Sequence, residues 1–225
     1  MPPKIWIVLG VEAFVFAGLL FYAAGTADWP PGWAFLGVVS VAAFLMVRMV
    51  ARHDPALLKD VLHWPIRRAA LPWDGFMLVI LTVLFPGWLA LMGLDAVRFD
   101  WSEMPDGLQI VGGIGVATAM AFFYRVFEEN TFVARLARAQ KERAERLIST
   151  GPYAVVRHPF YAALLFFCAS TALLLGSWFG LAAVVVIGAA LALRVALEDR
   201  ELREKLEGYA DYARRVPYRL VPGVW

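Results

Sequence analysis

The sequence predicts an all-α membrane protein, a polytopic helical bundle of about six apolar segments. Of its 225 residues, 61% are hydrophobic and only 18% are charged, below the roughly 25% of charged residues in soluble domains. The apolar residues form long runs rather than an amphipathic pattern, which favours contact with lipid over a soluble core. No polar stretch is long enough to bury a core of its own. We therefore expect a single membrane domain over residues 1–225.

Six apolar runs give the expected spans. Most approach the roughly 20 residues that cross a hydrocarbon core of about 30 Å. The fifth is short, and only Gly176 and Ser177 separate it from the sixth, so these two should form a tight helical hairpin, and one of them need not cross fully. The first is interpreted as a span rather than a signal peptide, because no clear cleavage site follows it. The runs are Ile5–Ala24, Trp33–Val50, Phe76–Leu94, Leu108–Phe127, Phe160–Leu175 and Trp178–Leu197.

The basic residues predict the orientation of the bundle. Of the 21 Lys and Arg residues, all but Arg98 fall on the side that also carries both termini. The positive-inside rule then places the N- and C-termini in the cytoplasm. A wrong number of spans would have scrambled this asymmetry. The high content of Ala, Arg and Gly suggests a bacterial inner membrane. The opposite side is acidic, with Asp28, Asp95, Asp100, Glu103 and Asp106.

Several other features exclude functions rather than suggest them. A formal net charge of +2 is too small to imply a nucleic-acid partner. The single cysteine, Cys168, stands in an apolar run and is expected to be a small buried hydrophobe. Gly112-Gly113-x-Gly115 lies in the fourth run, where it permits close helix contact. It lacks the strand–turn–helix context of a phosphate-binding loop. No metal site is predicted.

The polar residues before the fifth run are not explained by membrane insertion. The helical pattern Thr131–Leu147 extends the fourth run into the cytoplasm, and the turn Ser149–Tyr153 then ends it. Pro159 suits the first turn of the next helix. Arg157 and His158 would then stand at a helix N-terminus, where free N–H groups can hold a carboxylate or a phosphate.

A second polar group lies at the cytoplasmic end of the sixth run. Arg194 and Glu198 are four residues apart and share a helix face, whereas Asp199 lies about 100° further round. Taken alone, the first two could be an ordinary ion pair with a snorkelling arginine. The predicted hairpin, however, brings this end beside Arg157 and His158. The four charged groups and the imidazole should therefore share one pocket that opens to the cytoplasm and borders the lipid.

At these residues the sequence resembles the isoprenylcysteine carboxyl methyltransferase and phospholipid N-methyltransferase superfamily of integral-membrane enzymes. The resemblance covers residues 125–225 well and the first hundred residues only in general layout. It divides the domain into four spans (1–127) and a cofactor-binding and catalytic part (128–225). The second acid of the family is typically Glu and is Asp199 here. The motif is Gly151-Pro152-Tyr153-x3-Arg157-His158-Pro159-x-Tyr161, then Glu198-Asp199, Leu202, an amphipathic helix Leu202–Arg215 with Tyr209-x-x-Tyr212, and Val216-Pro217-Tyr218-Arg219.

The resemblance implies S-adenosylmethionine as methyl donor, with S-adenosylhomocysteine as product, in a largely enclosed cytoplasmic pocket. Arg157 and His158 would take the donor's carboxylate, and Glu198 or Asp199 its ammonium or ribose hydroxyls. Arg194 would orient an anionic acceptor, whereas an amine acceptor would need Glu198 or Asp199 as a base. The implied cofactor-binding residues are Tyr153, Arg157, His158, Pro159, Tyr161, Glu198 and Asp199, and the implied catalytic residues are Arg194, Glu198 and Asp199.

The acceptor and the reaction class remain open at this point. A lipid-like or small hydrophobic acceptor would enter from the bilayer. An isoprenylcysteine-type carboxylate is the most family-typical acceptor, and a phospholipid amine or a thiol is an alternative. A sterol-reductase-like NADPH enzyme would use the same pocket region. A non-enzymatic membrane protein, such as a transporter subunit, would need polar groups within its spans, and only Glu12 lies well inside one.

Overall fold

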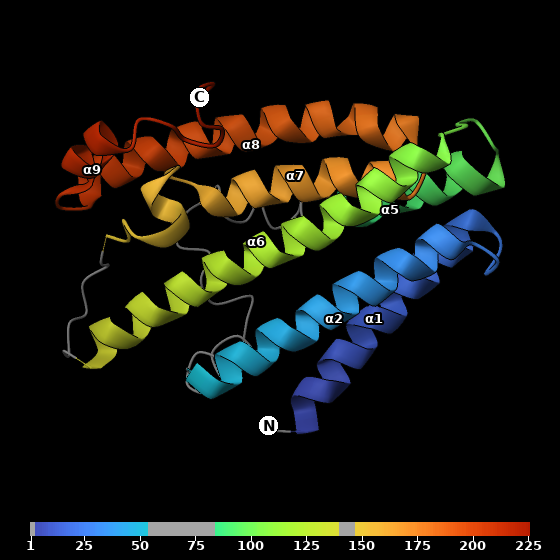
Figure 1. The fold of residues 1–225 in the computed structure, drawn as a ribbon, viewed down its shortest axis with the longest axis horizontal. Coiled ribbons are helices and arrows are strands. Elements are labelled where there is room, and N and C mark those ends of the chain that lie inside the picture. Colours follow the sequence, from blue (N-terminus) through green and yellow to red (C-terminus); the bar gives the residue numbers. More distant parts are fainter. Residues whose placement is uncertain (1–2, 54–83, 140–146) are drawn as a thin grey trace.

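The computed structural model describes residues 3–53, 84–139 and 147–225 (Figure 1). Within these ranges the chain is helical and contains no β-strand, which confirms the all-α fold class. Residues 76–83 of the predicted third run, residues 140–146 and the side chain of Glu12 lie outside the described residues. The elements are α1 (Pro3–Ala24), α2 (Pro30–His53), α5 (Phe85–Gly93), a π-helix η2 (Leu94–Arg98), α6 (Asp106–Ala139), a 3-10 helix η3 (Gly151–Ala154), α7 (Pro159–Leu174), α8 (Trp178–Lys205) and α9 (Tyr209–Arg215).

Four stretches in the described part of the chain are long and apolar enough to cross a membrane. They are Ile5–Ala24, Pro30–His53, Asp106–Asn130 and Trp178–Lys205. The predicted fifth run forms α7, which has 16 residues. At 1.5 Å per residue it is about 24 Å long, short of a hydrocarbon core of about 30 Å. The described residues thus contain four full-length candidate spans and one short apolar helix.

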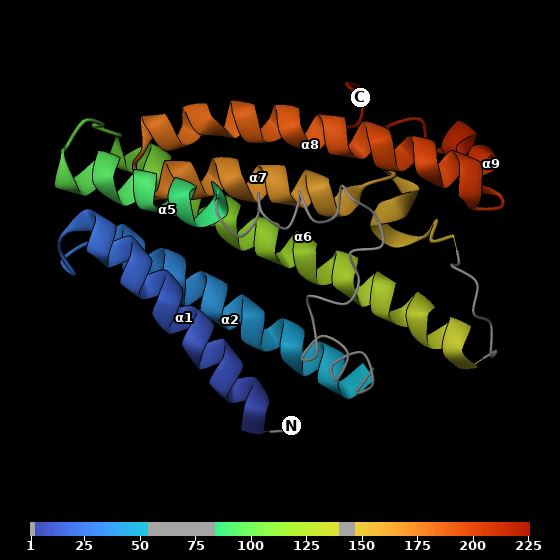
Figure 2. The same cartoon turned by 180° about the vertical axis from the view of Figure 1, so that it is seen from behind.

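The helices form a layered bundle (Figures 1 and 2). α1 and α2 lie together on one side, the long helix α6 crosses the middle beside α7, and α8 packs on α7. The connections at residues 25–29, 99–105 and 175–177 gather at one end of the bundle. The start of α7 and all of α9 lie at the other end, which is therefore the predicted cytoplasmic end.

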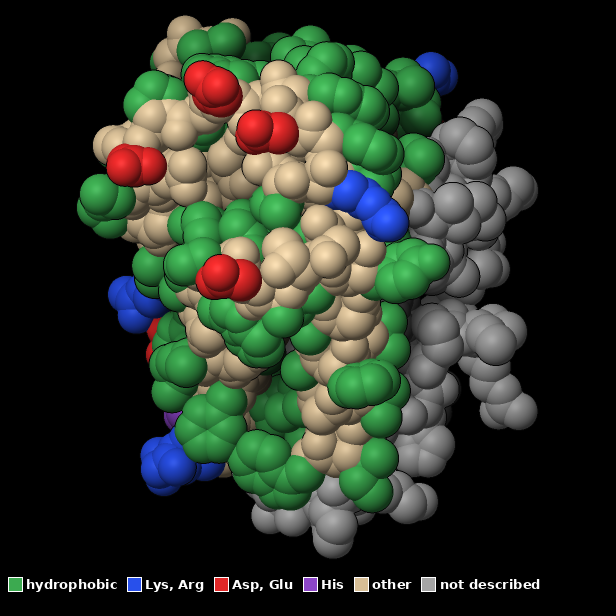
Figure 3. All heavy atoms as spheres, turned by 90° about the vertical axis from the view of Figure 1, so that its right-hand side faces the viewer, with side chains coloured by type: hydrophobic (Ala, Val, Ile, Leu, Met, Phe, Trp, Pro, Cys, Tyr) green, Lys and Arg blue, Asp and Glu red, His purple; other side chains and the backbone are tan. Residues whose placement is uncertain are grey.

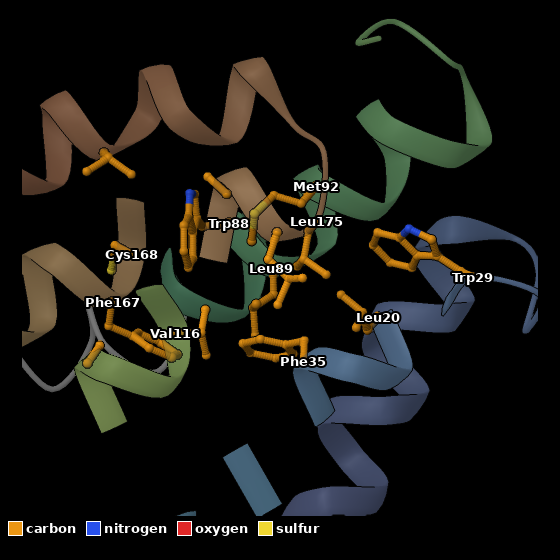
Figure 4. Close-up of a cluster of buried hydrophobic side chains, with 14 of the residues drawn as sticks. Leu20, Trp29, Phe35, Trp88, Leu89, Met92, Val116, Phe167, Cys168 and Leu175 are labelled. Atoms are coloured by element: carbon orange, nitrogen blue, oxygen red, sulfur yellow. The ribbon is translucent and has the colours of Figure 1, made fainter. Parts of the chain in front are cut away.

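A continuous apolar core joins α1, α2 and α5 to α6, α7 and α8. In Figure 4, side chains from these elements point toward one another between the helices. Met92 and Val116 are fully buried there, and Leu20 almost fully. Cys168 is free and buried in the same core, as predicted.

Glycines allow α6 and α7 to approach closely. A Cβ atom at Gly112 would clash with the backbone nitrogen of Leu174, and one at Gly115 would clash with the hydroxyl of Ser170. A Cβ atom at Gly113 would make only an ordinary van der Waals contact, 3.5 Å from a methyl group of Leu174. The predicted role of this glycine group in helix contact is therefore confirmed for Gly112 and Gly115.

The end of the bundle opposite to the predicted cytoplasmic end is acidic at its surface, and a buried carboxylate links its elements. Figure 3 shows carboxylate side chains gathered on this face, and the exposed acids here are Asp28, Asp100, Glu103 and Asp106. Beneath them Asp95 is fully buried and accepts hydrogen bonds from the hydroxyls of Ser102 (2.8 Å) and Ser177 (2.5 Å). It also accepts one from the Phe179 N–H, at 3.3 Å. Asp95 thus satisfies groups at the start of α8, where a negative charge is stabilising.

Candidate active site

The turn before α7 is fixed by the predicted cytoplasmic end of α6. Gly151 has φ +56, a left-handed conformation that favours glycine, and a Cβ atom there would lie 2.8 Å from the Glu129 carboxylate. The Thr150 hydroxyl donates a hydrogen bond to that same carboxylate. These contacts hold η3 against α6 and set the position of Tyr153, which η3 carries.

Arg157 is buried and points its guanidinium inward. Its Nε donates to Asp199 Oδ1 at 2.7 Å and its Nη2 to Oδ2 at 3.3 Å. Its Nη1 donates to the carbonyl oxygens of Val216 (2.7 Å) and Pro217 (2.8 Å). Four of the five N–H donors that an arginine offers are therefore used within the protein. Arg157 thereby links the start of α7 to α8 and to the C-terminal segment.

Asp199 is the centre of this buried network. Besides Arg157, its carboxylate accepts hydrogen bonds from the Tyr209 hydroxyl (2.8 Å), Arg203 Nε (3.2 Å) and Arg219 Nε (3.3 Å). The side chain is 1% exposed. Burial, and next the hydrogen bond to Asp199, raise the pKa of Tyr209, so its hydroxyl remains a donor. Three guanidinium groups and a phenol thus surround one carboxylate.

Backbone hydrogen bonds attach the C-terminal segment to the start of α7. The N–H of Arg157 donates to the carbonyl of Tyr218, and the N–H of His158 to that of Arg219, both at 3.0 Å. The sequence predicts N–H groups here that are free to bind an anion. The chain's own carbonyls use these two.

A cavity of about 170 Å³ lies beside the network and is open on one side. Glu198 is the carboxylate that lines it. The Tyr161 hydroxyl donates to Glu198 Oε2 at 2.9 Å, and Arg194 Nη2 lies 3.5 Å from the same oxygen. Asp199 and Arg194 are not among the lining residues. The cavity is lined by Leu147, Ile148, Tyr153, Arg157, His158, Pro159, Phe160, Tyr161, Glu198, Leu202, Leu206, Tyr209 and Tyr212.

His158 is a buried imidazole on the cavity wall with an unused nitrogen. Its Nε2 has no hydrogen-bond partner among the described residues. The same atom lies 3.6 Å from Asp199 Oδ1, and Nδ1 lies 4.0 Å from Glu198 Oε1. Burial lowers the pKa of His158 and outweighs the opposing effect of the two carboxylates. A neutral imidazole can therefore offer a donor or an acceptor to a bound molecule.

Tyr153 is held in the cavity wall from two sides. Its hydroxyl is hydrogen-bonded by the Asn130 side chain, and burial raises its pKa. Its carbonyl accepts a hydrogen bond from the Tyr212 hydroxyl at 2.7 Å, and burial raises the pKa of Tyr212 to about 12. Both tyrosines remain neutral donors under ordinary conditions.

Some residues of the site were not assigned a role from the sequence. Arg203 and Arg219 bind Asp199, Tyr209 and Tyr212 line the cavity, and Asn130 supports Tyr153. The spacing Tyr209-x-x-Tyr212 indicates from the sequence that these two tyrosines share a helix face. No local sequence pattern indicates a role in the site for Arg203 or Arg219. Among the residues that the structure describes, no group of three or more His, Cys, Asp or Glu side chains is arranged to hold a metal ion.

Comparison with known protein families identifies a related family. Residues 108–207 match the family model of phospholipid methyltransferases, and no curated protein matches the chain. The matched segment contains all of the cavity's lining residues except Tyr209 and Tyr212. This match confirms the resemblance that the motif at residues 151–161 predicts: residues 108–207 are similar to the phospholipid methyltransferases, part of the integral-membrane methyltransferase superfamily.

Proposed function

We propose that this protein is an integral-membrane methyltransferase that transfers a methyl group from S-adenosylmethionine to the polar head of a lipid-like acceptor. The observation that carries the proposal is that the family match and the cavity fall on the same segment of the chain. The segment that matches the phospholipid methyltransferases also forms nearly the whole wall of the cavity at the cytoplasmic end. Sequence family and cavity are independent indications of the same site.

The side chains on the cavity suit such a donor. Glu198 offers a carboxylate to an ammonium or to ribose hydroxyls, and Tyr153 and Tyr161 offer ring faces to adenine or a sulfonium. His158 adds an uncharged nitrogen without a partner. The cavity of about 170 Å³ is smaller than the roughly 300–1,000 Å³ of common ligand sites. Part of a donor of this size would occupy the open side.

Glu198 and Asp199 have different roles in this proposal. Glu198 faces the cavity and contacts the donor or the acceptor. Asp199 is turned away and holds Arg157, so it positions the wall without touching the reactants. Arg157 holds the same network from the start of α7 and itself lines the cavity. Pro159 begins the helix that carries Tyr161. Arg194 lies beside Glu198, 3.5 Å from its carboxylate, and sets the direction of that side chain.

When bound, S-adenosylmethionine supplies an electrophilic methyl group on a sulfonium. The task of the chain is then mainly to orient the two reactants, which can contribute roughly 7–11 kcal/mol to lowering a barrier. An anionic acceptor, such as an isoprenylcysteine-type carboxylate, needs no base. A phospholipid amine must lose a proton, and Glu198 is the carboxylate placed to take it. The family match supports the amine as the first acceptor to test.

Calorimetric titration of the detergent-purified protein with S-adenosylmethionine, S-adenosylhomocysteine and NADPH tests the donor. We expect saturable binding of the first two only, weakened by Glu198→Gln. Glu201→Gln is the matched control, because Glu201 is similarly exposed, sits one turn on and pairs with Lys205. Binding of NADPH alone would favour a reductase. Equal affinity of the two variants would remove Glu198 from the site.

Transfer of radiolabelled methyl groups tests the acceptor. The purified protein is supplied with phosphatidylethanolamine or with a prenylated cysteine analogue. We expect label in the phospholipid, and loss of turnover in Glu198→Gln. Label in the prenylcysteine instead, retained in Glu198→Gln, would assign a carboxylate acceptor. Arg194→Ala should lower turnover more than donor affinity in either case.

A further inference from the structure

The C-terminal segment Arg214–Trp225 combines exposed apolar and basic side chains. Val224 is 79% exposed, and Tyr218 and Val221 are also exposed. From α9 to Trp225 the sequence has three arginines, at 214, 215 and 219, against one acid, Asp211. Exposed aliphatic side chains interleaved with arginines are typical of segments that lie in a membrane interface.

The fold holds this segment beside the start of α7 and beside the part of α8 that follows its apolar run. After α9 the chain turns back and ends beside α8 (Figures 1 and 2). Its position is fixed by the backbone bonds from Arg157 and His158 and by the contact of Arg219 with Asp199. Asp199 stands two residues after the last residue of the predicted sixth run. The exposed valines therefore lie at the border of the lipid rather than far out in the cytoplasm.

The basic side chains of this segment have fewer acidic partners than those of the neighbouring helix α8. On α8, Arg200, Arg203 and Lys205 each bind a carboxylate four residues before or after them on the same helix. At the end of α9, Arg215 is exposed and forms no ion pair with the described residues. Among the described residues, Arg214 forms an ion pair only with the exposed Asp211. The segment thus keeps a net positive charge facing outward, which an anionic surface would complement.

We propose that the segment Arg214–Trp225 is a binding surface for anionic phospholipid head groups of the cytoplasmic leaflet. Arg214 and Arg215 bind the head groups, and Val221 and Val224 enter the boundary between head groups and acyl chains. The cytoplasmic leaflet carries a negative surface potential, and each basic residue close to it strengthens binding by about fivefold. This surface is separate from the cavity and requires neither a methyl donor nor an acceptor.

Lipid retention measures the charge preference. The full chain is reconstituted in nanodiscs with equal amounts of phosphatidylglycerol and phosphatidylcholine, and retained lipids are counted by native mass spectrometry. We expect enrichment of phosphatidylglycerol. Arg214→Gln/Arg215→Gln should reduce the enrichment, by about fivefold per arginine. The control Arg200→Gln/Lys205→Gln removes the same charge from paired, exposed positions on α8. Equal enrichment in both double variants, or none in the wild type, would overturn the proposal.

A spin label at Val224 measures the membrane contact itself. The label is placed by Val224→Cys in a Cys168→Ala background, with Arg200→Cys as the comparison position. In nanodiscs that contain phosphatidylglycerol, we expect the label at 224 to collide more with oxygen than with a water-soluble nickel chelate. A label at 224 as accessible to the chelate as one at 200 would contradict the proposal. Neither measurement uses S-adenosylmethionine, so its outcome is independent of the methyltransferase assignment.

Discussion

At the scale of single residues, two adjacent carboxylates have opposite surroundings. Glu198 faces the cavity with its side chain 29% exposed, whereas Asp199 is 1% exposed and surrounded by three arginines and a tyrosine. One residue along a helix rotates a side chain by about 100°, which is enough to move it from a cavity to a protein interior. The family's second acid is therefore a structural centre in this chain. A shorter Asp serves there because Arg157 reaches it at 2.7 Å.

Asp199→Asn should destabilise the protein strongly. It leaves Arg157, Arg203 and Arg219 around a neutral group, and breaking a buried ion pair in this way costs about 3–5 kcal/mol. Denaturant unfolding in mild detergent micelles measures the change. Asp211→Asn is the control, because it removes an exposed partner of Arg214 and should cost less than about 1 kcal/mol. Equal stability of the two variants would show that Asp199 is not the centre of the network.

His158 should make stability fall at mildly acidic pH. Burial lowers its pKa below the ordinary value of 6.5, so the folded protein holds a neutral imidazole. Stability is fully present above pH 6.5. It decreases as the pH falls from there toward the folded pKa, because only the unfolded chain takes up the proton. Unfolding midpoints measured between pH 7.5 and about 5 should fall less steeply in His158→Gln. Parallel profiles of the two proteins would mean that His158 takes up its proton at the same pH in the folded and the unfolded chain.

At the scale of elements, the position of α8 is set at both ends. Its start is held by Asp95, which accepts from Ser177 and from the Phe179 N–H, and its far end by the network around Asp199. Between them the Trp88 indole donates to the Gly180 carbonyl at 2.9 Å. A helix fixed in this way holds Glu198 at a constant depth relative to α7.

The contact between α6 and α7 depends on single glycines. Gly112→Ala should destabilise the protein by about 1–3 kcal/mol, because its Cβ atom meets the backbone of Leu174 and the helices would have to separate. Gly113→Ala is the control one residue away, where the new methyl group makes ordinary van der Waals contact. Denaturant unfolding compares the two. Equal effects would mean that the helices do not approach closely at Gly112.

At the scale of the whole molecule, the distribution of charge predicts which end faces the cytoplasm. A membrane-impermeant maleimide applied to intact bacterial spheroplasts can test this. Asp100→Cys, at the acidic end, should react from outside, and Arg200→Cys, at an exposed position on the other side, should react only after the membrane is opened. Buried Cys168 should give little background. Labelling of Arg200→Cys in intact cells, with Asp100→Cys protected, would reverse the orientation and move the cavity to the outer face.

The sequence by itself determined the all-helical membrane fold, the place of the polar cluster and the resemblance of residues 108–207 to the phospholipid methyltransferases. These follow from features that neighbouring residues share, namely apolar runs, charge asymmetry and the motif at residues 151–161. Only the tertiary structure decided that Glu198 faces the cavity and that Arg157 is turned inward. The partners in these contacts are distant in the chain: Arg157 lies 42 residues from Asp199 and 59 from Val216. Hydrophobic periodicity fixes which face of a helix meets lipid, but the packing of several helices fixes which donor meets which acceptor.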